Sequence, residues 1–156
     1  MDVLLIICLV LMNHVGAAPS PTVAEEIVSA LKGTPPSYRQ DILIIIAIES
    51  SFNDEATSDK GARGLMQLTD IAIKDVVDRQ LCGIDQLPTN IYNIKTNVTI
   101  GACFYTQLRL RFPDRDEALV YYNGGNAALA AYRKHKPFTE SKNYLSKFKA
   151  LEEKLP

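Results

Sequence analysis

The sequence predicts a mainly α-helical protein with at most a small β element. Signals for helix starts and ends recur along the chain, and apolar residues near its C-terminus follow a heptad-like spacing. The sequence contains no strongly alternating run typical of a β-hairpin and no internal repeat. With 156 residues, of which 47% are hydrophobic and 22% charged, the chain has the size and composition of one packed domain.

The first helix of this domain is predicted from Thr22, which is followed three residues later by Glu25 in the pattern of a capping box. Gly33 would end that helix, because glycine is common just past a helix C-terminus. The proline pair at 35–36 would then break the chain.

The second predicted helix covers residues 38–51, and its sequence is ambiguous. By propensity alone, the isoleucine-rich run at 42–48 favours a buried strand. Ser37 and Gln40 resemble a second capping box, however, and the segment is long for a strand. We therefore predict a fully buried helix here.

The rest of the chain is predicted to alternate between surface connections and helices. A polar loop is expected at 54–64, and an irregular connection that contains Pro88 at 81–96. Helical segments are expected at 65–80, as one helix or two, and at 97–112, 116–122, 126–134 and 139–155.

The N-terminus resembles an export signal. Ten consecutive apolar residues at 3–12 have the length of a signal-peptide core, whereas a membrane span needs about 20 residues. Val15 and Ala17 suit cleavage after Ala17, so residues 1–17 are a predicted leader and residues 18–36 a helix with a Pro-rich connection. No basic residue precedes the apolar run, which leaves an uncleaved or unusual leader as the alternative. The expected location is exported, in the periplasm or cell envelope.

The composition excludes several kinds of chemistry. A formal net charge of −1 gives no basic excess for binding nucleic acid, so no nucleic-acid partner is expected. Without the predicted leader, His135 is the one remaining histidine, and Cys82 and Cys103 lack the close spacing of metal or redox motifs. We therefore expect neither a catalytic metal nor a cofactor. The two cysteines are either paired in an oxidising compartment or separate buried thiols.

One acid occupies an unusual position in the predicted helix at 38–51. Glu49 follows Ile42, Ile45 and Ile46 by seven, four and three residues, so it shares their apolar face. Desolvation would raise the pKa of such a carboxyl and allow it to donate a proton near neutral pH. The alternative is a glutamate at the helix end that turns back to solvent.

The residues around Glu49 carry a family resemblance. Glu49 begins the sequence ESSF, which is followed by GARGLMQ at 61–67 and by YYNGG at 121–125. Asn97, Gly101 and Tyr105 lie between GARGLMQ and YYNGG, and Glu140 and Tyr144 follow YYNGG. This is the order in which the family has the corresponding residues. With ESSF and GARGLMQ counted as one signature, these are four motifs in order, which are far more specific than one. Over about residues 37–148 the chain resembles the lytic transglycosylases of the soluble, goose-lysozyme-like family.

This resemblance implies a lysozyme-like fold, with residues 37–156 as the catalytic domain, and a one-carboxylate mechanism. Glu49 would protonate the β-1,4 bond between N-acetylmuramic acid and N-acetylglucosamine and would then deprotonate the 6-hydroxyl, which closes a 1,6-anhydro ring. Tyr122 would donate its hydroxyl to Glu49 and hold it in place, unless it is simply a core tyrosine.

The resemblance also implies a set of glycan-binding residues. Ser58 would contact sugar, Met66 would form an apolar wall beside a ring, and Gln67 would bind acetamido groups. Asn123 would bind substrate, and Glu140 would orient Tyr122 or the substrate. The alternatives are core packing for Met66, local capping for Ser58 and a solvated helix-start acid for Glu140.

Two other functions remain open at this point. The first is a hydrolytic muramidase in which Asp54, Glu55 or Asp59 activates water as a second carboxylate. The second is a catalytically silent protein that binds peptidoglycan or assists assembly, because fold does not fix activity. In each case the expected partner is the glycan strand, and small members of the family often serve conjugation, secretion or phage machines.

Overall fold

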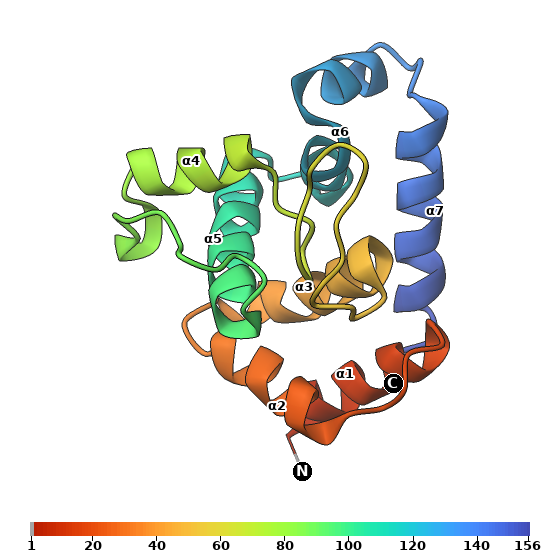
Figure 1. Cartoon of the computed structure of the whole chain (residues 1–156). Helices are drawn as coiled ribbons and strands as arrows, with labels where there is room; N and C mark the ends of the chain where they lie inside the picture. Colours follow the sequence, from red (N-terminus) through yellow and green to blue (C-terminus); the bar gives the residue numbers. More distant parts are fainter. Residues whose placement is uncertain (1) are drawn as a thin grey trace.

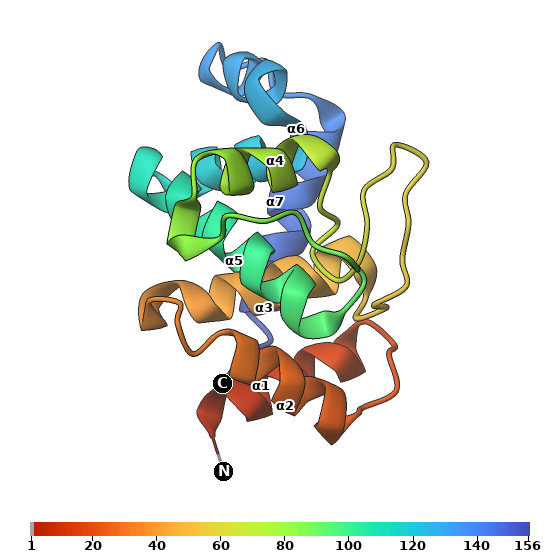
Figure 2. The same ribbon diagram turned by 60° about the vertical axis from the view of Figure 1, so that its left-hand side comes forward.

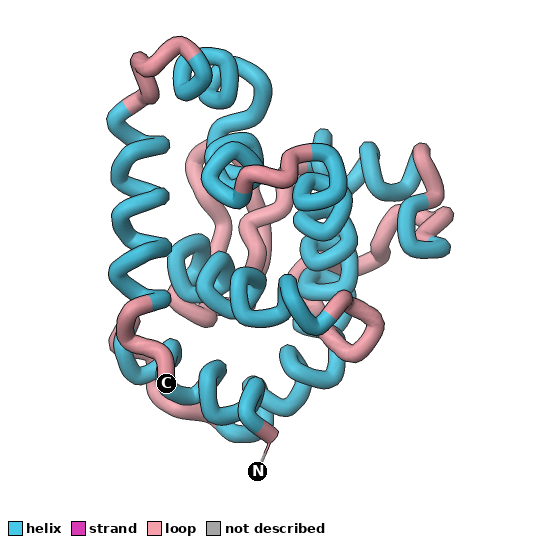
Figure 3. The backbone as a smooth tube through the Cα atoms, turned by 180° about the vertical axis from the view of Figure 1, so that it is seen from behind, coloured by secondary structure: helices cyan, strands magenta, loops and turns pink. Residues whose placement is uncertain are grey.

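The computed structural model describes residues 2–156, and nearly all of its regular structure is helical (Figure 1). The helices of this part of the chain are α1 (Val3–His14), α2 (Pro21–Ala30), α3 (Pro36–Ser50), α4 (Asp70–Asp78), the 3-10 helix η1 (Leu81–Gly83), α5 (Ile94–Arg111), α6 (Arg115–Arg133) and α7 (Thr139–Glu152). Within the described residues β structure is limited to isolated bridges in one loop, Thr57 with Arg63 and Arg63 with Leu68. The predicted fold class is confirmed, and Figure 3 shows the helices and their connecting loops from behind.

Helix α3 forms the centre of the molecule. Its residues 42–46 are completely buried, and it contacts α1, α5 and α7 (Figures 1 and 3). The isoleucine-rich run is therefore a helix, as predicted, because it is covered on every side. The capping box predicted at Ser37 is absent: Pro36 occupies the first helical turn, Pro35 is the N-cap residue, and no side chain caps this end.

Other helix boundaries differ from the predicted ones for local reasons. Ser20 caps α2 in place of Thr22, because Pro21 starts the helix earlier. Residues 64–67 form a turn, Leu68 belongs to a bridge, and α4 begins after Thr69, which caps it. The two helices predicted at 116–134 are two segments of α6, joined at a kink where Gly125 has a φ of 68°.

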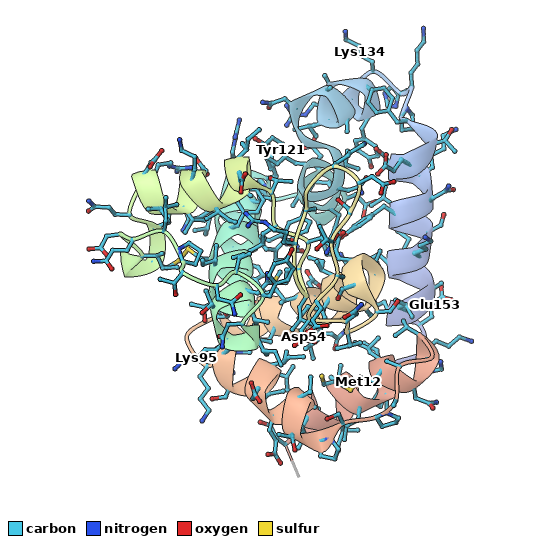
Figure 4. The ribbon with its side chains drawn as sticks, in the orientation of Figure 1. Met12, Asp54, Lys95, Tyr121, Lys134 and Glu153 are labelled. Atoms are coloured by element: carbon cyan, nitrogen blue, oxygen red, sulfur yellow. A yellow bond between two sulfur atoms is a disulfide. The ribbon has the colours of Figure 1, made fainter. Side chains whose placement is uncertain are left out.

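Helix α1 consists of residues from the predicted leader, and in this structure it packs against α2 and α3 (Figure 2). Cys8, Leu11 and Met12 are fully buried, and Met12 lies on the inner side of α1 (Figure 4). Cleavage after Ala17 stays a prediction. Within residues 2–156, none of the helices combines the length and the apolarity needed to cross a membrane.

A buried charge cluster attaches α7 to the centre of the fold. Asp41 in α3 accepts a hydrogen bond from the Tyr105 hydroxyl at 2.7 Å and lies 3.5 Å from both Arg109 and Arg115. Arg115 also forms a bidentate pair with Glu152 in α7, at 2.6 and 2.9 Å. Burial raises the pKa of Asp41, which the hydroxyl and the two arginines partly oppose. The cluster connects α3, α5, α6 and α7 around one carboxylate.

Cys82 and Cys103 form a disulfide between η1 and α5, so the pairing that the sequence left open is present. The bond spans a sequence separation of 21 residues, and the chain-entropy relation for a loop of this size gives a stabilisation of about 3 kcal/mol. Replacing both cysteines with alanine is expected to lower the free energy of unfolding by that amount in urea titrations. Equal unfolding free energies for the oxidised wild type and the double variant would contradict this prediction.

Candidate active site

Glu49 lies in the last turn of α3, where the chain leaves the helix abruptly. Ser51 and Phe52 both adopt left-handed backbone angles, with φ of 50° and 62°. The Ser50 hydroxyl donates back to the Ile46 carbonyl at 3.1 Å. This turn leads the chain away from the helix end, so the Glu49 carboxyl faces a cavity between elements and keeps only limited exposure.

The cavity at this carboxyl has a volume of about 390 Å³ and lies between α3, α6 and residues 140–147 of α7. Its lining is mostly polar and charged: Ile48, Glu49, Asn123, Glu140, Asn143, Tyr144 and Lys147. The amides of Asn123 and Asn143 supply both donors and acceptors, as sugar hydroxyl and acetamido groups require. Such a cavity suits a polar ligand beside the Glu49 carboxyl.

The surroundings of Glu49 keep its carboxyl protonated at pH values well above those at which a glutamate ordinarily ionises. Burial is the largest cause and raises the pKa of Glu49 from 4.5 to about 7. The negative charge of Glu140 raises this pKa further, whereas the Tyr144 hydroxyl and the positive charge of Lys147 lower it. The rise expected from the apolar face of α3 is therefore found, and about half of the Glu49 carboxyls are protonated near neutral pH.

Tyr144 carries the hydroxyl beside Glu49, a position that the family resemblance implies for Tyr122. It is buried, and its hydroxyl lies close enough to lower the pKa of Glu49, yet it makes no hydrogen bond of ordinary geometry within residues 2–156. Burial and the nearby Glu49 charge raise the pKa of Tyr144, so it stays a neutral donor. The spacing from Glu140 to Tyr144 is one helical turn, and this was the signal that could have placed both in the cavity.

Tyr122 is not hydrogen-bonded to Glu49, so that prediction is wrong. Its hydroxyl donates to the carbonyl of Met66 at 2.7 Å, and its ring packs edge-on against Tyr105. The next residue, Gln67, has a left-handed φ of 49°, and no backbone N–H of the described loops donates to the Met66 carbonyl. A buried carbonyl of this kind needs a donor, and Tyr122 supplies it.

Met66 belongs to the core and is not a wall beside a sugar ring, so the packing alternative is the correct one. Its side chain has no exposed surface, and it fills the space beside Gly101, where a Cβ atom would overlap the sulfur. The amide N–H of Met66 donates to Asn97 at 2.8 Å. The Met66 peptide is thus held on one side by Asn97 and on the other by Tyr122.

Asn97 is the anchor of the whole loop before α4. It is completely buried in α5, and its side-chain amide donates to the carbonyls of Arg63 and Ile91 at 3.0 and 2.9 Å. With the acceptor bond from Met66, one side chain pairs three backbone groups from two connections. The only signal for Asn97 in the sequence is its place in the order of the family motifs.

A family model described as a transglycosylase SLT domain matches residues 30–145. The chain belongs to this family. The match begins at the end of α2 and covers Glu49, the loop held by Asn97, and Tyr144.

Two solved structures of lytic transglycosylases are similar to this SLT domain. One is the lytic transglycosylase Slt from Pseudomonas aeruginosa, as an inactive glutamate-to-glutamine mutant; it is 25% identical, with a TM-score of 0.65 over 81% of this chain. The other is a 70-kDa soluble lytic transglycosylase in complex with bulgecin A, 21% identical, with a TM-score of 0.68 over 81% of this chain. The chain spans only 22% and 23% of the length of these two proteins. The lysozyme-like fold implied by the sequence motifs is confirmed.

The SLT domain brings only some of the predicted glycan-binding residues to the cavity. Asn123 and Glu140 line it, but Ser58, Met66 and Gln67 do not. The Gln67 amide donates to the carbonyls of Ala56 and Gly64, at 3.0 and 2.9 Å. The Ser58 hydroxyl accepts from the amide of Ala62 at 3.1 Å. Both side chains hold the loop together, which is the capping role weighed for Ser58.

The second carboxylate of the site is Glu140, in the first turn of α7. None of the loop acids proposed from the sequence as a hydrolytic base, Asp54, Glu55 and Asp59, lines the cavity. Glu140 does line it, and its charge acts on Glu49. Any two-carboxylate chemistry in this SLT domain would therefore have to use Glu140.

Proposed function

We propose that this SLT domain is a peptidoglycan lytic transglycosylase that cleaves the β-1,4 bond between N-acetylmuramic acid and N-acetylglucosamine. The observation that carries the proposal is the Glu49 carboxyl, which has a pKa of about 7 and lines a polar cavity. A general acid is most effective when its pKa lies near the working pH. The related Slt protein, inactive as a glutamate-to-glutamine mutant, gives further support.

In the proposed reaction Glu49 acts twice. Protonated Glu49 donates its proton to the glycosidic oxygen as the bond to the anomeric carbon of N-acetylmuramic acid breaks, and N-acetylglucosamine leaves as the alcohol. The 6-hydroxyl of the muramic acid then bonds to the anomeric carbon and gives its proton to the Glu49 carboxylate. The acid is regenerated, no water is consumed, and the product carries a 1,6-anhydro ring.

Product analysis tests this reaction against hydrolysis. Purified sacculi are digested in water enriched in oxygen-18, and the muropeptides are analysed by mass spectrometry. Transglycosylation gives anhydro ends without the heavy isotope, whereas hydrolysis with Glu140 activating water gives reducing ends that carry it. Binding of sacculi without any cleavage would support the catalytically silent alternative and overturn the proposal.

We further propose that the protein works outside the reducing cytoplasm. The Cys82–Cys103 disulfide is of the kind that persists in oxidising compartments, and the predicted leader is consistent with export. N-terminal sequencing of protein recovered from the cell envelope would find Ala18 as the first residue if cleavage occurs after Ala17.

Loss of the hydroxyl should affect different properties at the two tyrosines near Glu49: the pH profile of activity at Tyr144 and the stability at Tyr122. Tyr144→Phe removes a group that lowers the pKa of Glu49, so that pKa and the alkaline limb of the activity profile should move to higher pH. Removing a buried hydroxyl without a partner should leave stability unchanged or slightly higher.

Tyr122→Phe is the matched control for this prediction. It leaves the buried Met66 carbonyl unpaired, so it should lower the free energy of unfolding by about 1–3 kcal/mol while the alkaline limb keeps its position. Activity between about pH 5 and pH 9 and thermal melts are measured for both variants. A fixed limb in Tyr144→Phe, or a limb that moves to lower pH, would show that Tyr144 does not act on Glu49.

A further inference from the structure

Lys147 is a cation in the cavity that the proposed reaction does not use. It lies one turn beyond Tyr144 on the same face of α7, lines the cavity with Glu49, and forms no ion pair within residues 2–156. It also lies beyond residue 145, where the family match ends. By contrast, the ammonium of Lys149 on the same helix is paired with Asp116 at 3.3 Å.

The charged residues of α7 make the two ends of the cavity differ in charge. Glu140 and Lys147 are two helical turns apart, which corresponds to about 10 Å along the axis, and both line the cavity. Tyr144 lies between them beside Glu49. One end of the cavity is therefore negative and the other positive, with the acid between the two ends.

We propose that Lys147 binds a carboxylate carried by the N-acetylmuramic acid of the glycan and thereby sets the direction in which the strand lies across Glu49. The inference rests on the proposed function, which supplies the glycan. In peptidoglycan the sugar rings are uncharged, and the carboxylates belong to the peptide stem of muramic acid or, where no stem is attached, to its lactyl group. A carboxylate pairs favourably with Lys147 and is repelled at the other end by Glu140. The reverse orientation would therefore be disfavoured.

The same ion pair would keep more of Glu49 protonated when substrate is bound. The charge of Lys147 lowers the pKa of Glu49 in the free protein. A bound carboxylate neutralises that charge, so a larger fraction of Glu49 stays protonated in the complex. The alkaline limb of kcat should therefore lie at higher pH than the limb of kcat/KM, because kcat reports the complex and kcat/KM the free protein.

The test measures binding of three tetrasaccharide ligands by calorimetry, on the Glu49→Gln background so that none is consumed. The first ligand carries peptide stems, the second has been stripped of stems by an amidase and carries free lactyl carboxylates, and the third carries stems whose carboxylates have been converted to amides. Lys147→Met is expected to weaken binding of one carboxylate-bearing ligand about tenfold and to leave binding of the amidated ligand unchanged.

The ligand that is affected identifies the source of the carboxylate. A loss confined to the stem-bearing ligand assigns the stem, and a loss confined to the stripped ligand assigns the lactyl group. Lys147→Arg should retain the preference, and Lys142→Met, on the same helix but outside the cavity, should change nothing. Equal binding of all three ligands before and after Lys147→Met would overturn the inference.

Failure of this inference is distinguishable from failure of the proposed function. Cleavage of sacculi by the wild-type chain is measured separately and does not depend on the preference for charged ligands. If the wild-type chain cleaves sacculi but Lys147→Met changes the affinity for none of the three ligands, the inference is refuted and the proposed function stands. A protein that shows the Lys147-dependent preference but never cleaves refutes the proposed function and leaves the binding role of Lys147 in place.

Discussion

Glu49→Gln is expected to reduce peptidoglycan cleavage by about 10³-fold or more while the fold is retained. Glutamine nearly matches glutamate in size and remains compatible with the polar cavity, but its amide cannot donate a proton to the glycosidic oxygen. Cleavage is measured on purified sacculi, with circular dichroism to confirm folding. Activity above a few per cent of wild type in a folded variant would assign the acid to another residue.

The same variant should be more stable than the wild type at alkaline pH. The pKa of Glu49 is raised from 4.5 to about 7 in the folded state, so the folded chain binds the proton more tightly than the unfolded chain. Stability therefore falls as pH rises through this window, by about 3 kcal/mol in total. Glutamine does not titrate. Melts at about pH 4 should nearly coincide for the two proteins, whereas at about pH 8 the variant should unfold at the higher temperature.

Asn97→Ala is expected to be the most destabilising single substitution outside the apolar core, at about 3–5 kcal/mol. It would leave the amide of Met66 and the carbonyls of Arg63 and Ile91 buried without partners. The Met66 carbonyl also accepts a hydrogen bond from Tyr122 in α6. Displacement of the Met66 peptide would therefore also weaken the contact between this loop and α6.

Two companion variants make this expectation specific to the side-chain pairing. Asn97→Asp keeps an acceptor for the Met66 amide but loses both donors, so it should also destabilise strongly. Thr99→Ala, at an exposed position of the same helix, should change the free energy of unfolding by less than about 0.5 kcal/mol. Urea titrations measure all three. A cost below about 1 kcal/mol for Asn97→Ala would show that water or rearranged backbone replaces the amide.

The parts of the site that depend on helical periodicity could be predicted from sequence. Once residues 38–51 are helical, the spacing of Glu49 from Ile42, Ile45 and Ile46 places the acid on an apolar face, and its raised pKa follows from burial. Glu140 could be expected in the site through the motif order. These predictions need only one helix and one family pattern.

The parts that depend on which acceptor a buried donor meets could not be predicted. Tyr122 is partly buried and Tyr144 is buried, and both lie near Glu49. The path of the loop at Met66 decides that the Tyr122 hydroxyl pairs with a carbonyl, whereas the Tyr144 hydroxyl lies beside the acid. Gln67 is similar, because its left-handed backbone turns its amide back to the carbonyls of its own loop. Sequence spacing carries no information about such turns.

The pKa of Glu49, measured directly by carbon-13 NMR of the side-chain carboxyl, tests the central claim that the fold itself makes this residue an acid for neutral pH. The Glu49→Gln variant assigns the signal by its absence. The structure predicts a titration midpoint near 7, in step with the alkaline limb of cleavage. A midpoint near the ordinary value of 4.5 would contradict the account, because a carboxyl ionised at neutral pH cannot start the proposed reaction.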